Sequence, residues 1–230
     1  MRAARDQLVE GSAGLGVELS PLQLDQLLGY LNLIQKWNKV YNLTAVRNPA
    51  EMVTHHLLDS LAVVAPLRRQ LDVMGVDGSA QLLDVGSGAG LPGVVIAICL
   101  PQLVVHCVDT VAKKAAFLNQ VAVTLRLDNL RSVHARVENL TGQYDVISSR
   151  AFASLADFTA WSGAALKKGG TWLAMKGQHP QEEIRALEPG IEVFHVEQLT
   201  VPGLAAQRCI VWMRQAQCRA LTDVQAATMP

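Results

Sequence analysis

The sequence predicts an α/β fold in which helices cover both faces of a mostly parallel, doubly wound sheet. Short apolar segments of strand length alternate with longer segments of helical periodicity between residues 81 and 213. One of these strands, Leu82–Val85, is followed directly by a glycine-rich turn and an apolar helix. The chain has 230 residues, of which 50% are hydrophobic and 17% are charged. This is enough for one globular α/β domain with an extension.

The residues before this domain predict an N-terminal helical extension packed on it. Ser20 and Pro21 supply an N-cap and a first helical residue, and leucines follow at helical spacing. Glycines then mark a linker. The expected segments are a frayed start over 1–16, a helix over Ser20–Tyr41, a second helix over Pro49–Leu71 and a linker over Met74–Ala80, so that the extension covers 1–75 and the main domain 76–214.

The sequence of the main domain predicts alternating strands and helices, followed by an antiparallel hairpin. The apolar runs on either side of Pro202 and Gly203 predict this closing hairpin. A loose tail is expected over 215–230. The expected strands are Leu82–Val85, Leu103–Val108, Leu130–Ala135, Tyr144–Ser148, Thr171–Met175, Ile191–Leu199 and Arg208–Met213. The expected helices are Val94–Leu100, Thr110–Leu127, Leu155–Leu166, which Lys167–Gly170 would end, and Glu182–Leu187.

The glycine-rich turn is the candidate nucleotide site. Gly86, Gly88 and Gly90 allow the backbone to turn sharply and to approach a ligand closely. Residues 88–93 satisfy the dinucleotide pattern G-x-G-x-x-G, which leaves an NAD-dependent oxidoreductase as one alternative. The wider string, an acidic Asp84 followed by one apolar residue and three spaced glycines, resembles more closely the first motif of S-adenosylmethionine (SAM) methyltransferases. A carboxylate at Asp84 favours a cationic ligand such as SAM over a pyrophosphate.

Polar residues at the ends of three further strands are candidates for the same site. Asp109 ends the second strand and can accept hydrogen bonds from ribose hydroxyls under either alternative. Val137 follows the third strand, where a backbone N–H and an apolar side chain can contact an adenine ring. Arg150 and Lys176 end the fourth and fifth strands, and we expect them to orient substrate or cofactor.

The remaining chemistry-bearing residues predict neither a metal site nor a disulfide. His55 and Asp59 are four residues apart and can face each other on a helix, but no third ligand has matching spacing, so no metal is expected. The scattered cysteines, Cys99, Cys107, Cys209 and Cys218, suit a reducing compartment. With no signal peptide and no apolar run of membrane-spanning length, we expect a cytoplasmic protein, and we expect it to be a monomer.

Short motifs occur along the chain in a fixed order. They are Trp37-Asn38, Asn42-Leu43-Thr44, His56 with Asp59-Ser60-Leu61, Asp84–Gly93, Asp109 with Lys113-Lys114 and Phe117-Leu118, Arg136 with Glu138, Ser149-Arg150-Ala151 and Lys176-Gly177. Together these motifs resemble the glucose-inhibited division protein B family of bacterial 16S ribosomal RNA guanine-N7 methyltransferases. The resemblance covers about residues 20 to 213, and its N-terminal motifs are specific to this family. It implies a Rossmann-like fold with a seven-stranded sheet, SAM as cofactor, and contacts to SAM from Gly86, Leu91, Val137, Glu138 and Arg150.

The implied substrate is one guanosine in a functional loop of 16S rRNA within the small subunit. Guanine N7 carries a lone pair and no proton, so methylation requires positioning and no general base. The net charge is zero, so RNA binding requires a local basic face, for which the candidates are Lys113, Lys114, Lys167 and Lys168. A non-catalytic RNA- or protein-binding module on a decayed methyltransferase fold is the remaining alternative.

Overall fold

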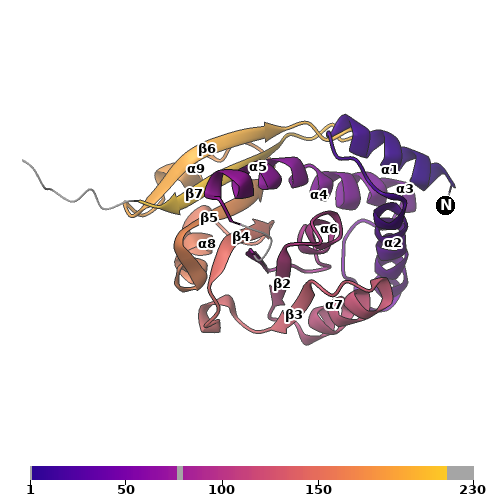
Figure 1. Cartoon of the computed structure of the whole chain (residues 1–230), viewed down its shortest axis with the longest axis horizontal. Coiled ribbons are helices and arrows are strands. Elements are labelled where there is room, and N and C mark those ends of the chain that lie inside the picture. The colour runs from indigo at the N-terminus through magenta and orange to yellow at the C-terminus, as the bar shows by residue number, and fades with distance from the viewer. Residues whose placement is uncertain (1, 77–79, 217–230) are drawn as a thin grey trace, which may run out of the picture.

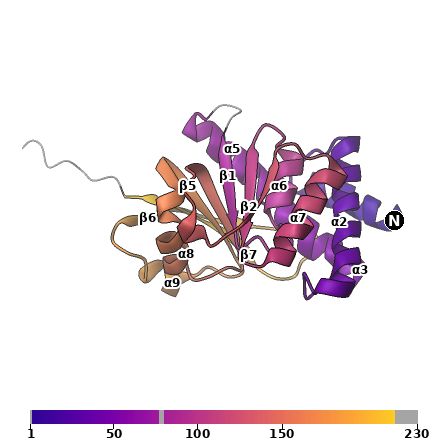
Figure 2. The ribbon, with the colours of Figure 1, turned by 90° about the horizontal axis from the view of Figure 1, so that it is seen from below.

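The protein is built around one seven-stranded sheet with helices on both faces (Figures 1 and 2). The computed structural model describes residues 2–76 and 80–216. The strand order is β3-β2-β1-β4-β5-β7-β6. The strands are β1 (Gln81–Val85), β2 (Val104–Asp109), β3 (Leu130–His134), β4 (Tyr144–Arg150), β5 (Leu166–Lys176), β6 (Ile191–Leu199) and β7 (Arg208–Gln215).

The pairing confirms the predicted fold class. Strands β1 to β5 pair in parallel, whereas β7 is antiparallel to both β5 and β6. The chain places β2 and β3 on one side of β1 and then returns to place β4 and β5 on the other side. This change of direction opens a crevice at the carboxyl ends of β1 and β4. Because β7 runs opposite to β5, its first residues lie beside the end of β5, where Lys176 pairs with Cys209.

Side chains of β1 alternate between two hydrophobic cores, one on each face of the sheet. Leu82 packs with the helices of one face, and Leu83 packs with α8 on the other. Figure 2 shows α6, α7 and α2 on one side of the strands and α8 and α9 on the other. These helices are α6 (Gly93–Cys99), α7 (Ala112–Leu125), α8 (Leu155–Ser162) and α9 (Gln181–Arg185).

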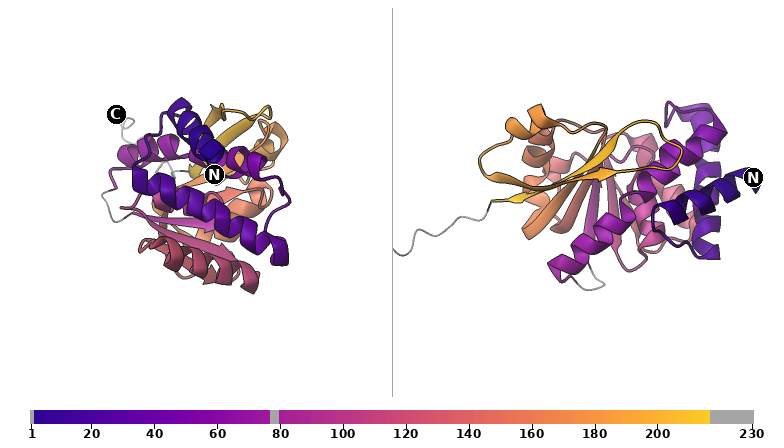
Figure 3. Two further views of the ribbon diagram at one scale, coloured as in Figure 1. Left: turned by 90° about the vertical axis from the view of Figure 1, so that its right-hand side faces the viewer. Right: turned by 90° about the horizontal axis from the view of Figure 1, so that it is seen from above.

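The long helix α2 (Pro21–Tyr41) packs against α7, which covers one face of the sheet (Figure 3, left). Ser20 and Gln23 form the capping box that begins it. Near its start, Gln26 donates to the carbonyl of Leu125 at the end of α7 (2.9 Å), and near its end Trp37 packs edge-on against Phe117 (5.4 Å between ring centroids). The two helices are therefore antiparallel, and the end of α2 lies at the crevice edge of the sheet.

Two expectations for the N-terminal part are wrong. Residues 2–14 form a helix, α1 (Arg2–Gly14), in which Leu8 is fully buried. Gly11 of this helix packs so closely on Leu58 that a Cβ there would lie 2.6 Å from its methyl carbons. This contact joins two segments that are far apart in the sequence, so a local pattern does not predict it.

The second predicted helix exists but is interrupted. It comprises α3 (Pro49–Met52), a π-helical segment (Val53–Leu58), α4 (Asp59–Leu61) and, after a turn, α5 (Val64–Met74). The π-helical segment changes which side chains face the sheet, an effect that 3.6-residue periodicity does not predict.

A third expectation is also wrong, because Lys167–Gly170 do not end a helix. Helix α8 ends at Ser162, and Lys167 and Lys168 are the second and third residues of β5. The division at residue 75 stays a prediction, since side chains from both parts, including Leu27 and Leu82, share one hydrophobic core. Residues 77–79 of the expected linker and residues 217–230 of the expected tail lie outside the described residues.

Candidate active site at the carboxyl edge of the sheet

Two adjoining cavities, of about 500 and 350 Å³, open at the crevice, and both are lined by Gly86 and Ala151. The larger cavity, here called the N-terminal cavity, lies between the 43–59 segment, the ends of β4 and β5, and the start of β7. The smaller one, here called the β2–β3 cavity, lies over the ends of β2 and β3. A ligand that spans the junction would contact both glycine-loop backbone and the β4–α8 loop.

The glycine loop is held from beneath by Asp84. Its carboxylate is fully buried and accepts hydrogen bonds from Gly93 N (3.1 Å) and Ser148 Oγ (2.8 Å). Burial raises the pKa of Asp84 to about 7, against the lowering effect of both hydrogen bonds. Asp84 lines neither cavity, so the geometry gives it a supporting position, and its predicted contact with a cofactor stays a prediction.

Gly86 and Gly90 perform different tasks in the loop. Gly86 has φ = +64°, and a Cβ there would overlap the ring of Phe152, so only glycine allows this ring to close the wall between the cavities. Gly90 lines neither cavity. It packs against Val94 and Leu118, where a Cβ would lie within 2.6 Å of side-chain carbons.

Four of the residues that the sequence assigned to the cofactor line the β2–β3 cavity, namely Gly86, Asp109, Val137 and Glu138. Gly88, Leu91 and Arg150 line the N-terminal cavity instead. Asp109 accepts from Gly88 N (3.0 Å), Val111 N (2.9 Å) and Lys114 Nζ (3.2 Å). Val137 is buried and Glu138 is exposed, and both line the cavity. Lys114 is therefore a partner of Asp109 inside this cavity, which is a different position from the RNA-facing one predicted for it.

The N-terminal helices supply one wall of the other cavity. Tyr30, fully buried in α2, donates its hydroxyl to the carbonyl of Ala89 in the glycine loop (2.5 Å). The side chain of Thr44 contacts Nε2 of His56 at 3.0 Å. Burial, together with the charge of Arg150, lowers the pKa of His56 to about 4, so this ring is neutral at pH 7.

Asp59 lies between two arginines in the same cavity. Its Oδ2 accepts from Arg150 Nη1 (2.9 Å) and its Oδ1 from Arg208 Nε (2.8 Å). Arg150 also donates to the carbonyl of His55 (3.1 Å). Among the described residues, no group of three His, Cys, Asp or Glu side chains is arranged to hold a metal ion.

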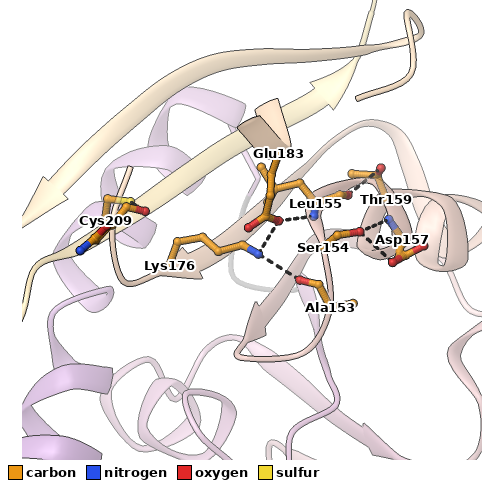
Figure 4. A network of polar contacts seen from close by, with 9 residues as sticks. Ala153, Ser154, Leu155, Asp157, Thr159, Lys176, Glu183 and Cys209 are labelled. Atoms are coloured by element: carbon orange, nitrogen blue, oxygen red, sulfur yellow. Dashed lines mark hydrogen bonds and ion pairs between the residues drawn. The ribbon is translucent and has the colours of Figure 1, made fainter. Parts of the chain in front are cut away.

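Lys176, at the end of β5, ties three segments together (Figure 4). It donates to the carbonyl of Ala153 (2.9 Å) and to Glu183 of α9 (2.7 Å), whose carboxylate also accepts from Leu155 N at the start of α8 (2.8 Å). Ala151, two residues before Ala153 in the same loop, has φ = +51°, a strained conformation for alanine. Lys176 thus lines the N-terminal cavity and also holds the loop that separates the two cavities.

The predicted set of RNA-facing lysines does not share one face. Lys113 is exposed in the first turn of α7, beside the crevice. Lys167 pairs with Asp145 (2.8 Å) at the beginning of β4, and Lys168 is its neighbour in β5. Both lie at the amino edge of the parallel strands, opposite to the cavities, so they do not form one basic face with Lys113.

Comparison with known proteins places this geometry in a family. A family model described as rRNA small subunit methyltransferase G (GidB) matches residues 23–211. The chain belongs to this family. It is 63% identical over 225 residues to the ribosomal RNA small subunit methyltransferase G of Polaromonas sp., covering 98% of this chain and 100% of that one. The protein of the same name from Acidovorax sp. is 65% identical over 211 residues, covering 90% and 93%.

Solved structures of other methyltransferases share the fold. TrmN from Thermus thermophilus has a TM-score of 0.53 at 17% identity, covering 71% of this chain and 53% of that one. Ribosomal protein L11 methylase from Lactobacillus delbrueckii has a TM-score of 0.51 at 12% identity, covering 67% and 79%. These similarities confirm the Rossmann-like methyltransferase fold, and membership of the methyltransferase G family decides against the oxidoreductase alternative.

Sequence reasoning missed Phe152 and Trp161, which line the β2–β3 cavity. It also missed Arg208 in the N-terminal cavity. Arg208 is the first residue of β7, far from every motif in the sequence, and it reaches the crevice because β7 is antiparallel to β5. A cation at the start of the last antiparallel strand was the available signal. The residues Thr44, His56 and Asp59 were visible as a motif, but only the structure brings them into the cavity.

Proposed function

We propose that the protein transfers a methyl group from SAM to N7 of one guanosine in a functional loop of 16S rRNA, within the small ribosomal subunit. The observation that carries this proposal is the junction of two cavities at Gly86 and Ala151, in a chain of the rRNA small subunit methyltransferase G family. A cofactor in one cavity and a base in the other would meet at that junction.

The residues of the β2–β3 cavity fit the adenosine part of SAM. Val137, Phe152 and Trp161 offer apolar surface to a flat ring, and Asp109 offers carboxylate oxygens to ribose hydroxyls. Glu138 is exposed at the same cavity. When bound, SAM supplies a methyl group activated by the sulfonium charge.

Positioning is the main task that this reaction leaves to the protein. Guanine N7 has a lone pair and no proton, so no side chain has to act as a base. His56 is neutral, Asp59 is ion-paired with Arg150, and Lys176 is ion-paired with Glu183. These states agree with a site that orients its substrate without moving protons. We propose that Arg150 contacts the cofactor and that Lys176 orients the substrate by holding the loop at Ala151.

The target guanosine has to leave any helical context to enter the N-terminal cavity. Its N7 lies on the major-groove edge, which an A-form RNA duplex hides. Lys113 in α7, Arg47 and Arg136 are exposed on segments next to the two cavities, and we propose them as contacts to the surrounding RNA. A neutral protein with few such contacts should bind short naked RNA weakly.

The test is transfer of labelled methyl from SAM to small subunits isolated from a strain that lacks this gene. We expect nuclease mapping to place the label on one guanosine, and chromatography of the released nucleoside to identify it as methylated at N7. SAM binding without label on these subunits would move the substrate to free or precursor RNA. No SAM binding would favour the non-catalytic alternative.

Within the described residues no helix is long and apolar enough to cross a membrane. We further propose that the protein acts as a monomer in the cytoplasm.

A further inference from the structure

Asp59 orients two guanidinium groups that come from two strands on either side of β5. Its side chain is only 3% exposed and each of its oxygens accepts from a different arginine. Arg150 belongs to the end of β4 and Arg208 to the start of β7. Arg208 is held further by a hydrogen bond from Nη1 to the carbonyl of Gln207 (2.8 Å). Both guanidinium groups are therefore positioned before any ligand arrives.

The charges in the N-terminal cavity do not balance. Arg150, Arg208 and Lys176 line it, whereas Asp59 is the one acidic residue among the described residues that do so. Lys176 has its own partner, Glu183, outside the lining. Two arginines therefore share one carboxylate, which leaves one positive charge in excess. A partly buried cation without a counterion favours binding of an anion.

The arginines also have hydrogen-bond donors to spare. Arg150 uses Nη1, and Arg208 uses Nε and Nη1. Among the described residues, no hydrogen bond is formed by Nε or Nη2 of Arg150, or by Nη2 of Arg208. A guanidinium group matches the oxygen spacing of a phosphate.

We propose that Arg208 binds a backbone phosphate of the RNA next to the target guanosine, with Asp59 as the residue that positions it beside Arg150. This inference rests on the proposed function, because that function supplies the RNA. Contacts to phosphate set the register of a nucleic acid without reading its sequence. A phosphate held in this cavity fixes where the flipped base can lie relative to the junction at Gly86.

The anion could instead be the carboxylate of SAM, which shares the same chemistry. The overall charge argues for phosphate. SAM carries a sulfonium and an ammonium against one carboxylate, so an excess cation repels the molecule as a whole, whereas each RNA phosphate is a net anion. We therefore assign the phosphate to Arg208 and keep Arg150 as the proposed cofactor contact.

The experiment compares Arg208→Gln with a matched control, Arg214→Gln. Arg214 lies on the same strand, is 45% exposed and pairs with Glu192 outside both cavities. For Arg208→Gln we expect the KM for small subunits to rise about ten-fold, as for loss of one hydrogen bond to a charged group. The salt dependence of subunit binding should fall by about 0.7 in log–log slope, which corresponds to one lost phosphate contact. The Kd for SAM, from calorimetry, should stay within about two-fold of the wild type.

Three outcomes would overturn the inference. A wild-type KM for Arg208→Gln on subunits that the wild type does methylate would refute it and leave the proposed function standing. A raised Kd for SAM with an unchanged KM for subunits would assign the anion to the cofactor. Failure of the wild type to methylate any subunit would remove the proposed function and the inference with it.

If Arg208→Gln does not fold, Arg208→Lys keeps a charge beside Asp59. The same rise in the KM for small subunits is expected, because an ammonium lacks the planar fork of a guanidinium group.

Discussion

Replacing Gly86 by alanine tests how the wall between the two cavities is built. Gly86 has φ = +64°, and its missing Cβ is the space that the ring of Phe152 occupies. Gly75, the C-cap of α5, has nearly the same φ of +62°, yet nothing lies within 4 Å of the position of its Cβ. The pair Gly86→Ala and Gly75→Ala therefore shares the backbone strain and differs in the overlap with the ring.

The structure gives a magnitude for each term. Alanine in the left-handed region costs about 1 kcal/mol at either position. Overlap with a packed side chain adds about 1–3 kcal/mol. The free energy of unfolding should thus fall by about 1 kcal/mol for Gly75→Ala and by about 2–4 kcal/mol for Gly86→Ala. Movement of Phe152 also displaces the wall at Ala151, so the affinity for SAM should drop about ten-fold or more for Gly86→Ala alone.

Urea unfolding measures the first quantity and calorimetry with SAM the second. A double-mutant cycle separates the terms, because in a Phe152→Ala background the cost of Gly86→Ala should shrink to that of Gly75→Ala. Equal stability losses and unchanged SAM affinity for both single variants would refute the argument that the Phe152 contact requires a glycine.

Three further predictions concern buried polar groups. Because burial raises the pKa of Asp84 from 3.8 to about 7, the folded state holds a proton between these pH values that the unfolded state has lost, so the free energy of unfolding falls with rising pH by up to about 1.4 kcal/mol per unit. Asp84→Asn should flatten this fall in urea titrations at pH 5, 6 and 7, and an unchanged slope would contradict the raised pKa. Tyr30→Phe leaves the carbonyl of Ala89 without its donor and should lower the free energy of unfolding by about 1–2 kcal/mol in urea; no loss would mean that the carbonyl finds another donor. Lys176→Met releases the carbonyl of Ala153 and should lower kcat/KM on small subunits about ten-fold, an effect that an added Ala151→Gly should partly reverse by relieving the strain. No reversal would show that Lys176 acts on the substrate directly.

The local patterns that predicted the fold are those with a short physical range. The apolar run of β1, the capping residues around Ser20 and the glycines of the loop each act within one turn or one strand. For the same reason the sequence placed Asp109 and Arg150 at strand ends correctly, and parallel pairing brings such ends to one edge.

The errors arise where contacts between distant segments override local pattern. Helix α1 packs on the π-helical segment through contacts such as Gly11 on Leu58. The π-helical segment departs from the 3.6-residue period, so the spacing of apolar residues does not predict it. The start of β5 was misplaced because Gly169 and Gly170 look like a helix end, although both lie within β5, at an irregularity between its pairings of Leu166 with Tyr144 and Thr171 with Val146.

The sequence by itself determined the fold class, the glycine loop and the edge of the sheet at which the site lies, because strand ends and turns are local features. Only the tertiary structure decided how that site is divided and charged. Asp84 was expected at the ligand and lies beneath the loop, and Lys114 was expected at the RNA and pairs with Asp109. Arg150 and Arg208 are 58 residues apart and meet at Asp59 through the antiparallel return of the last strand, a juxtaposition that no local pattern encodes.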